Sequence, residues 1–200
     1  MFDLLLHPDV LIEAVGLLGL FVIIFAETGF LFGIFFPGDS LLFTAGLFSA
    51  LGKVDLVALI FGSIFMAIIG DSVGYYTGKK FGPSLFKKEE SFFFKKSYLE
   101  KTKDYFNKYG SVAIIIARFV PGVRTITPIL AGSVKMNYKN FLFCNIIGAV
   151  VWVLSMTLLG YFLGSKIENI DSYILPIALS IIILSLIPTA LGILKAKNRI

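Results

Sequence analysis

Two uncharged segments of the chain are each long enough to cross a lipid bilayer. They span residues 141–165 and 172–194, and neither contains Asp, Glu, Lys or Arg. A spanning helix needs about 20 apolar residues, so both segments are predicted to be transmembrane helices. With 57% hydrophobic and only 16% charged residues, the chain is too apolar for the polar surface of a soluble protein. We therefore expect an integral membrane protein.

Two further apolar segments, residues 10–26 and 54–78, are predicted to span although they include Glu13 and Asp71 respectively. Two hundred residues suffice for one bundle of about four to six membrane elements. The sequence thus predicts a single all-α membrane domain covering residues 1–200.

Two other apolar stretches are interrupted near their middle. Residues 28–52 are broken by Pro37 and Gly38, and residues 111–134 by Pro121 and Gly122. Proline removes a backbone donor and glycine loosens a helix, and neither half of either stretch reaches spanning length. Both are predicted to be re-entrant helical hairpins. Because broken backbone at membrane depth needs protein or water to satisfy it, the two tips should line a common cavity.

The chain also repeats itself with a period of about 85 residues. The Pro-Gly pairs are 84 residues apart, and the following Ala-Gly and Gly-Tyr pairs are 86 apart, in PGDSLLFTAG…GYYTGKK and PGVRTITPILAG…GYFLGSK. Each unit is a broken hairpin followed by a helix, which predicts repeats at residues 28–78 and 111–166. A linker at residues 79–110 joins the two repeats, and residues 172–194 form the final transmembrane helix.

The positive charge is concentrated in the linker. Residues 79–108 hold nine lysines against four acidic residues, a surplus equal to the whole net charge of +5. This distribution is the positive-inside pattern, so the linker and the C-terminus are predicted to be cytoplasmic, the linker as an amphipathic element on the inner membrane surface. No nucleic-acid partner is expected.

The positions of the two hairpins relative to this linker predict the topology. The first hairpin would enter from the outer face and the second from the cytoplasmic face, so the two repeats would be inverted. About four transmembrane helices plus two re-entrant hairpins in an inverted repeat is an architecture that transporters use for alternating access.

Apart from Glu13 and from Asp55 at the start of 54–78, five ionisable residues lie inside or next to apolar stretches: Glu27, Asp39, Asp71, Arg118 and Arg124. Exposed to lipid they would together cost on the order of 10 kcal/mol, so they must face inward and find partners. One interpretation is that they only pair, as a buried electrostatic clamp. The other is that they are kept for function, because buried ion pairs can often be replaced by apolar residues without loss of stability.

The residue types suggest distinct roles. Arg118 and Arg124 carry planar forks that suit bidentate binding of phosphate. Glu27 and Asp39 could take up and release protons, because an apolar environment favours the neutral form of a carboxyl group. Asp71 could cap a helix, pair with an arginine or join this proton path.

Other residues on the same helices are expected to serve packing. Glycine recurs every fourth residue beside Asp71, at Gly70, Gly74, Gly78 and Gly82, which predicts a smooth face for close helix contact. On the corresponding helix of the second repeat, Asn145 is expected to bond across helices and Trp152 to pack.

These motifs resemble the DedA family, the bacterial members of the SNARE-associated, VTT-domain superfamily. The resemblance extends from about residue 25 to residue 193 and rests on AETGFLFGIFFPGDSLLFTAG, GDSVGYYTGKKFG, SYLEKTKDYFNKYG, ARFVPGVRTITPILAG and NIIGAVVWVLSMTLLGYFLG. It implies re-entrant hairpins in inverted repeat, a plasma-membrane location and lipid flipping coupled to ion gradients. The acids and arginines needed for function in the family fall on Glu27, Asp39, Arg118 and Arg124.

The expected function is therefore a proton-linked flippase in the bacterial inner membrane. Its substrate would be undecaprenyl phosphate or, second, phosphatidylethanolamine. No enzyme activity, cofactor or metal is expected, and the partners would be the lipid, protons or another cation, and further copies of the chain. An ion/proton antiporter and a polyprenyl-pyrophosphate phosphatase remain as alternatives, although the only histidine, His7, leaves the phosphatase without a histidine nucleophile.

Overall fold

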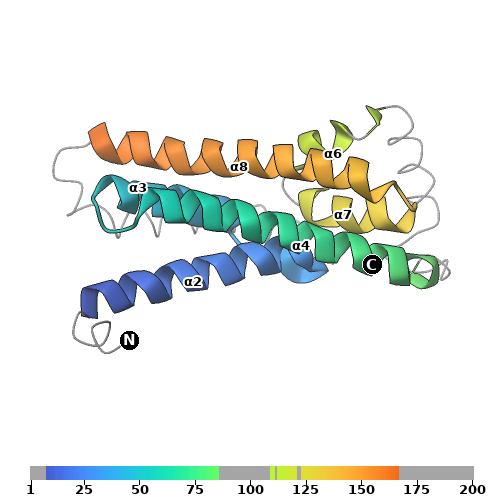
Figure 1. Ribbon diagram of the computed structural model, residues 1–200, viewed down its shortest axis with the longest axis horizontal. Coiled ribbons are helices and arrows are strands. Elements are labelled where there is room, and N and C mark those ends of the chain that lie inside the picture. The colour runs from blue at the N-terminus through green and yellow to red at the C-terminus, as the bar shows by residue number, and fades with distance from the viewer. Residues whose placement is uncertain (1–7, 86–108, 111, 121–122, 167–200) are drawn as a thin grey trace, which may run out of the picture. The chain divides into compact units, whose positions relative to one another are not determined.

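The computed structural model describes residues 8–85, 109–110, 112–120 and 123–166, and the regular structure within these ranges is entirely helical (Figure 1). The all-α prediction is confirmed for these residues. In chain order the elements are α2 (Pro8–Gly29), the 3-10 helix η1 (Leu31–Phe35), α3 (Gly38–Ala50), α4 (Leu56–Leu85), α6 (Val112–Ala117), α7 (Val123–Ser133) and α8 (Tyr138–Lys166). The predicted helix at 172–194, most of the linker 79–110, and the turn residues Pro121 and Gly122 lie outside the described residues.

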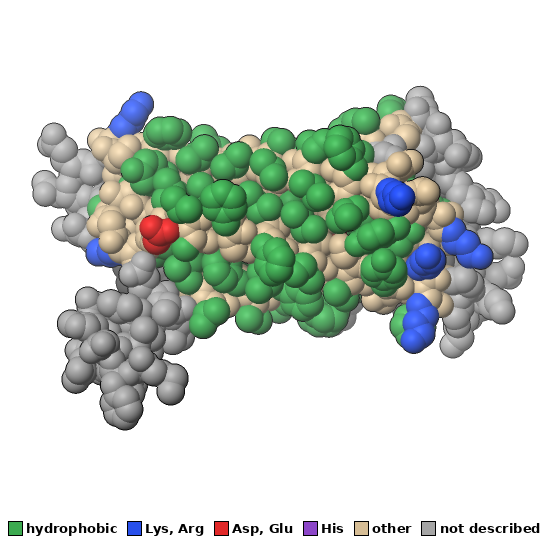
Figure 2. Space-filling view, in the orientation of Figure 1, with side chains coloured by type: hydrophobic (Ala, Val, Ile, Leu, Met, Phe, Trp, Pro, Cys, Tyr) green, Lys and Arg blue, Asp and Glu red, His purple; other side chains and the backbone are tan. Residues whose placement is uncertain are grey.

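Two of these helices can cross a membrane. The 27 residues Leu56–Gly82 of α4 and the 29 residues of α8 are long and apolar enough. At 1.5 Å per residue each is about 40 Å long, more than the roughly 30 Å of a hydrocarbon core. Several phenylalanines on these two helices are more than half exposed: Phe61, Phe65, Phe143 and Phe162. The face of the molecule seen in Figure 2 is largely apolar, and such a surface suits lipid rather than water.

Both interrupted stretches are broken where the sequence predicted. Pro37 separates η1 from α3, and α6 ends at Ala117 before α7 begins at Val123. The arms α3 and α7 have 13 and 11 residues, too few to cross a bilayer. The re-entrant path of these arms stays a prediction. Helix α4 differs from expectation at its end, because it continues beyond residue 78 into the predicted linker, to Leu85.

The chain forms two compact units. The first unit comprises Met1–Ile24, Ile34–Ser63 and Val153–Ile200, and the second unit comprises Phe25–Gly33 and Ile64–Trp152. Helices α2, α4 and α8 each pass from one unit into the other. The single-domain expectation stays a prediction.

In the first unit, α3 packs on the C-terminal part of α8 through glycine. A Cβ atom on Gly46 would collide with the backbone of Thr157, and one on Gly160 with the backbone of Phe43. Gly164 likewise leaves room for Leu47. Only residues without a side chain allow two helix backbones to approach this closely.

In the second unit, α7 packs on the C-terminal part of α4 in the same way. A Cβ atom on Gly78 would collide with the backbone of Ile129, one on Gly82 with Ser133, and one on Gly132 with the backbone of Tyr75. The broken arm of each predicted repeat therefore contacts the long helix of the other repeat: α3 lies on α8, and α7 lies on α4 (Figure 1).

The glycine face predicted on α4 is confirmed, and it has two neighbours. Gly78 and Gly82 contact α7, whereas Gly70 contacts Thr28 and Gly29 at the end of α2. The ends of α2 and α7 therefore both pack on the glycine face of α4 in the second unit.

The arm α3 ends in a Schellman motif. Gly52 has a positive φ of 71°. Its N–H donates to the Ser49 carbonyl at 3.0 Å, and the Lys53 N–H donates to the Phe48 carbonyl at 3.1 Å. Glycine is the usual residue at this left-handed position.

The arm α7 ends in the same motif with lysine instead. Lys135 has φ 57° and donates its N–H to the Gly132 carbonyl at 3.0 Å, while the Met136 N–H donates to Ala131 at 3.0 Å. A residue with a Cβ atom is strained in this conformation, so Lys135 lowers the stability of the turn.

Replacing Lys135 by glycine should therefore stabilise the protein. We expect Lys135→Gly to raise the free energy of unfolding by about 0.5–1 kcal/mol, measured by thermal unfolding in a neutral detergent. The matched control is Gly52→Ala, which should lower stability, because no described atom lies near the added Cβ and only the backbone conformation opposes it. A lower melting temperature for Lys135→Gly would contradict the assignment of strain to this residue.

Candidate functional site

The second unit contains a buried ion pair between α2 and α7. Glu27, two residues before the end of α2, accepts a hydrogen bond from Nη2 of Arg124, the second residue of α7. The Glu27 side chain is 1% exposed and that of Arg124 is 9% exposed. Both charges oppose the dipole of their own helix, so each depends on the other for neutralisation.

Close packing around the end of α2 places Glu27. A Cβ atom on Gly33 would collide with the backbone of Glu27, so η1 folds directly back onto α2. On the α4 side, Gly29 lies against the backbone of Gly70. Glycines in three elements therefore hold this carboxylate at a fixed position in the second unit.

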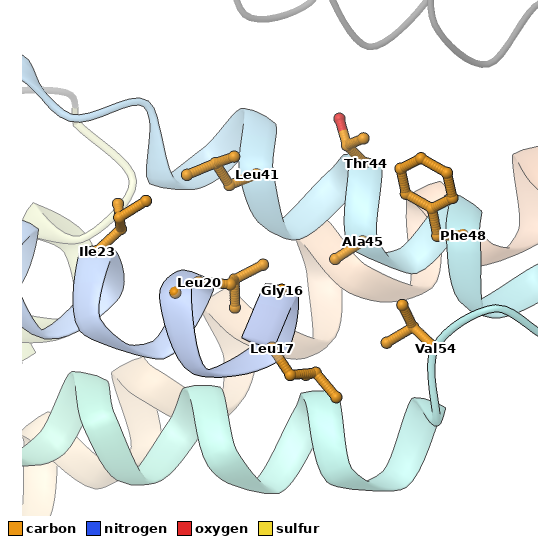
Figure 3. Close-up of a pocket in the computed structure, with 10 residues that line it drawn as sticks. Gly16, Leu17, Leu20, Ile23, Leu41, Thr44, Ala45, Phe48 and Val54 are labelled. Carbon is orange, nitrogen blue, oxygen red and sulfur yellow. The ribbon is translucent and has the colours of Figure 1, made fainter. Parts of the chain in front are cut away.

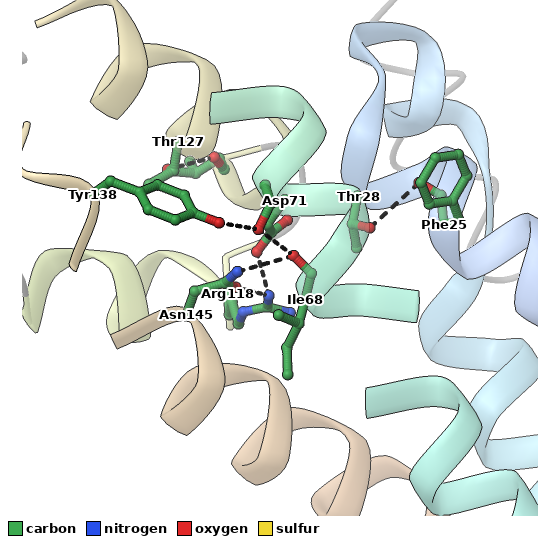
Figure 4. A network of polar contacts seen from close by, with 10 residues as sticks. Phe25, Thr28, Ile68, Asp71, Arg118, Thr127, Tyr138 and Asn145 are labelled. Atoms are coloured by element: carbon green, nitrogen blue, oxygen red, sulfur yellow. Dashed lines mark hydrogen bonds and ion pairs between the residues drawn. The ribbon is translucent and has the colours of Figure 1, made fainter. Parts of the chain in front are cut away.

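A second buried ion pair joins Arg118, just after α6, to Asp71 in α4 (Figure 4). Nη2 of Arg118 also donates to Oδ1 of Asn145 in α8. Asn145 in turn donates from Nδ2 to the Ile68 carbonyl at 3.2 Å, so that the amide binds α4 as well. The expected cross-helix bond of Asn145 is confirmed. Of the three roles expected for Asp71, namely capping a helix, pairing with an arginine or joining a proton path, the structure shows the pairing.

Gly148 provides the room for Arg118. A Cβ atom at position 148 would lie 2.8 Å from Cδ and 3.1 Å from Nε of Arg118. The arginine stem therefore lies across the surface of α8 where that helix has no side chain. Its Nε is buried and has no hydrogen-bond partner among the described residues.

Trp152 contacts both arginines. The centre of its ring is 5.0 Å from Cζ of Arg124 and 5.9 Å from Cζ of Arg118, and the side chain is 1% exposed. Each such cation–π contact contributes about 0.5–2 kcal/mol. The indole thus keeps two like charges near each other, which Coulomb repulsion would otherwise oppose.

We call Glu27, Asp71, Arg118 and Arg124 the four-charge cluster. Its two positive and two negative side chains belong to four different segments of the second unit, and all are largely shielded from solvent. In a medium of low dielectric constant an unbalanced charge would be costly, so the cluster is stable as a neutral set.

The remaining predicted site residues lie elsewhere in the chain. Asp39 belongs to the first unit, in the first turn of α3, where a carboxylate interacts favourably with the helix dipole. Pro37 precedes α3 and Gly38 begins it. The proton-coupling role of Asp39 stays a prediction.

The first unit contains an apolar cavity of about 340 Å³ between α2 and α3 (Figure 3). Its lining is aliphatic and aromatic apart from Thr44, and includes Leu17, Leu20 and Ile23 of α2 with Leu41 and Phe48 of α3. Such a lining suits a hydrocarbon chain and offers almost nothing to a polar ligand.

Sequence reasoning missed the roles of Gly148 and Trp152. The sequence signal that could have revealed them is their spacing, because Asn145, Gly148 and Trp152 follow one another at intervals of three and four residues and so share one face of α8. Reading Trp152 as packing overlooked that an indole can also bind a guanidinium.

Filling the space over Gly148 should displace Arg118. We expect Gly148→Ala to lower the free energy of unfolding by about 1–3 kcal/mol, because the methyl group overpacks the site and weakens a buried ion pair. Gly16→Ala is the matched control; no described atom lies within 4 Å of its added Cβ, so it should stabilise α2 slightly. Equal melting temperatures for the two variants would contradict the tight fit at Gly148.

Comparison with known proteins adds a family relationship to this geometry. Residues 36–162 match the VTT domain. The chain is 41% identical to Protein DedA of Escherichia coli over 99% of its length and 94% of that protein. It is 45% identical to an uncharacterized membrane protein of Mycobacterium tuberculosis, over 85% of this chain and 75% of the relative. Inner membrane protein YqjA of Escherichia coli is 34% identical over 82% of this chain and 73% of its own length. No solved structure matches.

Proposed function

Because the chain is a membrane protein of the DedA family with a VTT domain, we propose that it flips a phosphate-headed lipid across the bacterial inner membrane in a proton-linked cycle. The observation that carries this proposal is the neutral four-charge cluster, in which two arginines are buried against two carboxylates. Undecaprenyl phosphate is our preferred substrate, and phosphatidylethanolamine is the second.

Charge balance links phosphate to protons in this mechanism. A phosphate group can replace a carboxylate beside an arginine only if that carboxylate becomes neutral, because an extra buried charge is expensive. Protonation of Glu27 would free Arg124, and protonation of Asp71 would free Arg118. Proton release would then restore the ion pairs and expel the headgroup.

The two arginines differ in what they offer a phosphate. Arg124 is in the first turn of α7, so a phosphate bound to it would also meet the positive end of a helix dipole. Arg118 has a buried Nε–H without a partner among the described residues, and an unsatisfied donor of this kind gains a hydrogen bond when an anion arrives. We assign the first contact to Arg124 and the second to Arg118.

The pairing of the arginines favours a phosphate monoester over a diester. With Glu27 and Asp71 both neutral, the two guanidinium groups, which both contact Trp152, carry two positive charges. A monoester can supply two negative charges, whereas a diester such as the phosphatidylethanolamine phosphate supplies one. This is the physical reason for preferring a polyprenyl phosphate.

Two further features support a lipid substrate. The apolar cavity of the first unit suits a hydrocarbon chain. The exchange of arms between the two repeats is compatible with the inverted-repeat architecture in which one repeat moves against the other. In the proposed topology the linker 79–110 and the C-terminus are cytoplasmic.

The decisive experiment is lipid flipping in proteoliposomes with an imposed pH gradient. Wild-type protein should flip a labelled polyprenyl phosphate, and a protonophore should slow it. Arg124→Lys keeps the charge that Glu27 needs but loses the planar fork, so we expect a roughly ten- to hundredfold slower rate with the protein still folded and inserted. Lys166→Arg, an exposed change of similar size, is the control and should flip normally.

The same vesicles separate the alternatives. A cation flux without lipid flipping would indicate an ion/proton antiporter, and release of inorganic phosphate from a polyprenyl pyrophosphate would indicate a phosphatase. Flipping by Arg124→Lys at the wild-type rate would overturn the proposed role of the fork.

Trp152 should report occupancy of the site directly, because it is the single tryptophan of the chain. A phosphate entering between the two guanidinium groups changes the charge next to the indole, so its emission should shift when a short-chain polyprenyl phosphate is titrated into detergent-solubilised protein. Arg124→Lys should weaken this response. An equal response to a phosphodiester lipid at the same concentration would contradict the monoester preference.

A further inference from the structure

Among the residues of the second unit that the structure describes, the exposed charges all have one sign. Within its described residues the exposed charged side chains are lysines, whereas the carboxylates Glu27 and Asp71 are buried in the four-charge cluster. We call the exposed set the lysine surface, which consists of Lys79, Lys80, Lys135 and Lys139. In Figure 2 basic side chains gather beyond the apolar face at the right of the view.

Helix packing brings these lysines to the same end of the second unit. A Cβ atom on Gly132, three residues before Lys135, would lie 2.8 Å from the backbone nitrogen of Lys79. Tyr76 in α4 and Tyr138 in α8 have ring centres 5.1 Å apart, and Lys80 and Lys139 are their near neighbours in the chain. The lysines of α4, of the α7–α8 turn and of α8 therefore form one surface.

Aromatic side chains accompany the lysine surface. Tyr76 is 51% exposed and Phe81 is 50% exposed, with the Lys80 ammonium 5.3 Å from the centre of the Phe81 ring. Tyrosine and lysine at the end of an apolar helix are typical of the boundary between hydrocarbon and headgroups. This composition suits a surface at the level of the lipid phosphates better than one out in the aqueous phase.

The backbone conformation of Lys135 is a second observation in favour of a role for positive charge there. Lys135 adopts the left-handed conformation that Gly52 adopts at the end of α3. Its backbone is strained there because it has a Cβ atom, whereas a glycine would not be. A residue that breaks a local rule of backbone chemistry without a packing reason points to a functional one. Its ammonium group is the feature that glycine could not supply.

We propose that the lysine surface binds the headgroups of anionic phospholipids of the cytoplasmic leaflet. This site is separate from the four-charge cluster and does not depend on transport. Each lysine near an anionic membrane surface attracts it electrostatically, and the attraction weakens with salt. Bound anionic lipid would fix the depth and orientation of α4 and α8 in the bilayer.

Thermal unfolding in lipid nanodiscs tests this proposal without any transport measurement. Nanodiscs of phosphatidylcholine alone are compared with nanodiscs containing about one third phosphatidylglycerol, at low and high salt. We expect phosphatidylglycerol to raise the melting temperature of the wild-type protein by several degrees at low salt, and much less at high salt. The quadruple change of Lys79, Lys80, Lys135 and Lys139 to Gln should remove most of that increase.

Two variants make the test specific. Lys135→Gly should unfold at a higher temperature than wild type in phosphatidylcholine, yet gain less from phosphatidylglycerol, a combination that a purely structural role of Lys135 would not produce. The control pair Lys53→Gln and Lys166→Gln removes exposed lysines of the first unit and should keep the full gain.

Three outcomes would overturn the proposal. They are an undiminished gain in the quadruple variant, an equal loss in the first-unit control pair, or an equal gain when inorganic phosphate is added to phosphatidylcholine nanodiscs. The last result would identify free phosphate, rather than a lipid headgroup, as the ligand.

Discussion

Charged groups that are buried away from water must neutralise one another, and this requirement organises the second unit. Glu27 and Arg124 join the end of α2 to the start of α7, while Asp71 and Arg118 join α4 to the segment after α6. If either pair separated, two uncompensated charges would remain in an apolar surrounding, at a cost of several kcal/mol. The pairs therefore fix which segments meet, and glycines at the contacts let those segments come close enough.

Much of this fold follows from short-range chemistry and could be read from the sequence. Apolar length identifies α4 and α8, because a spanning helix satisfies its own backbone. The break before α3 follows from Pro37, which cannot donate a hydrogen bond, and the packing face of α4 follows from glycine at every fourth position. The need for ionisable groups within apolar stretches to find partners also follows from their cost in lipid.

The identity of those partners could not be read in the same way. Which acid meets which arginine depends on how each helix is rotated and on contacts between residues far apart in the chain. Asp39 stands beside a predicted break and Asp71 within a long helix, yet it is Asp71 that pairs with Arg118 in the second unit. The role of Trp152 was hidden for the same reason, since an indole in an apolar helix has the same sequence signature whether it contacts leucine or a guanidinium.

The crossing of α3 onto α8 and of α7 onto α4 has a consequence for how the protein is made. The contact surface of α3 at Gly46 is completed by Thr157, which leaves the ribosome roughly 110 residues later. At usual translation speeds this delay is roughly 10 s, during which the first half of the chain is already in the insertion machinery without its partner. A nascent chain of this design needs protection by insertase or lipid until α8 is released, and a ribosome that stalls before then leaves a chain in which α3 lacks the helix that it packs against.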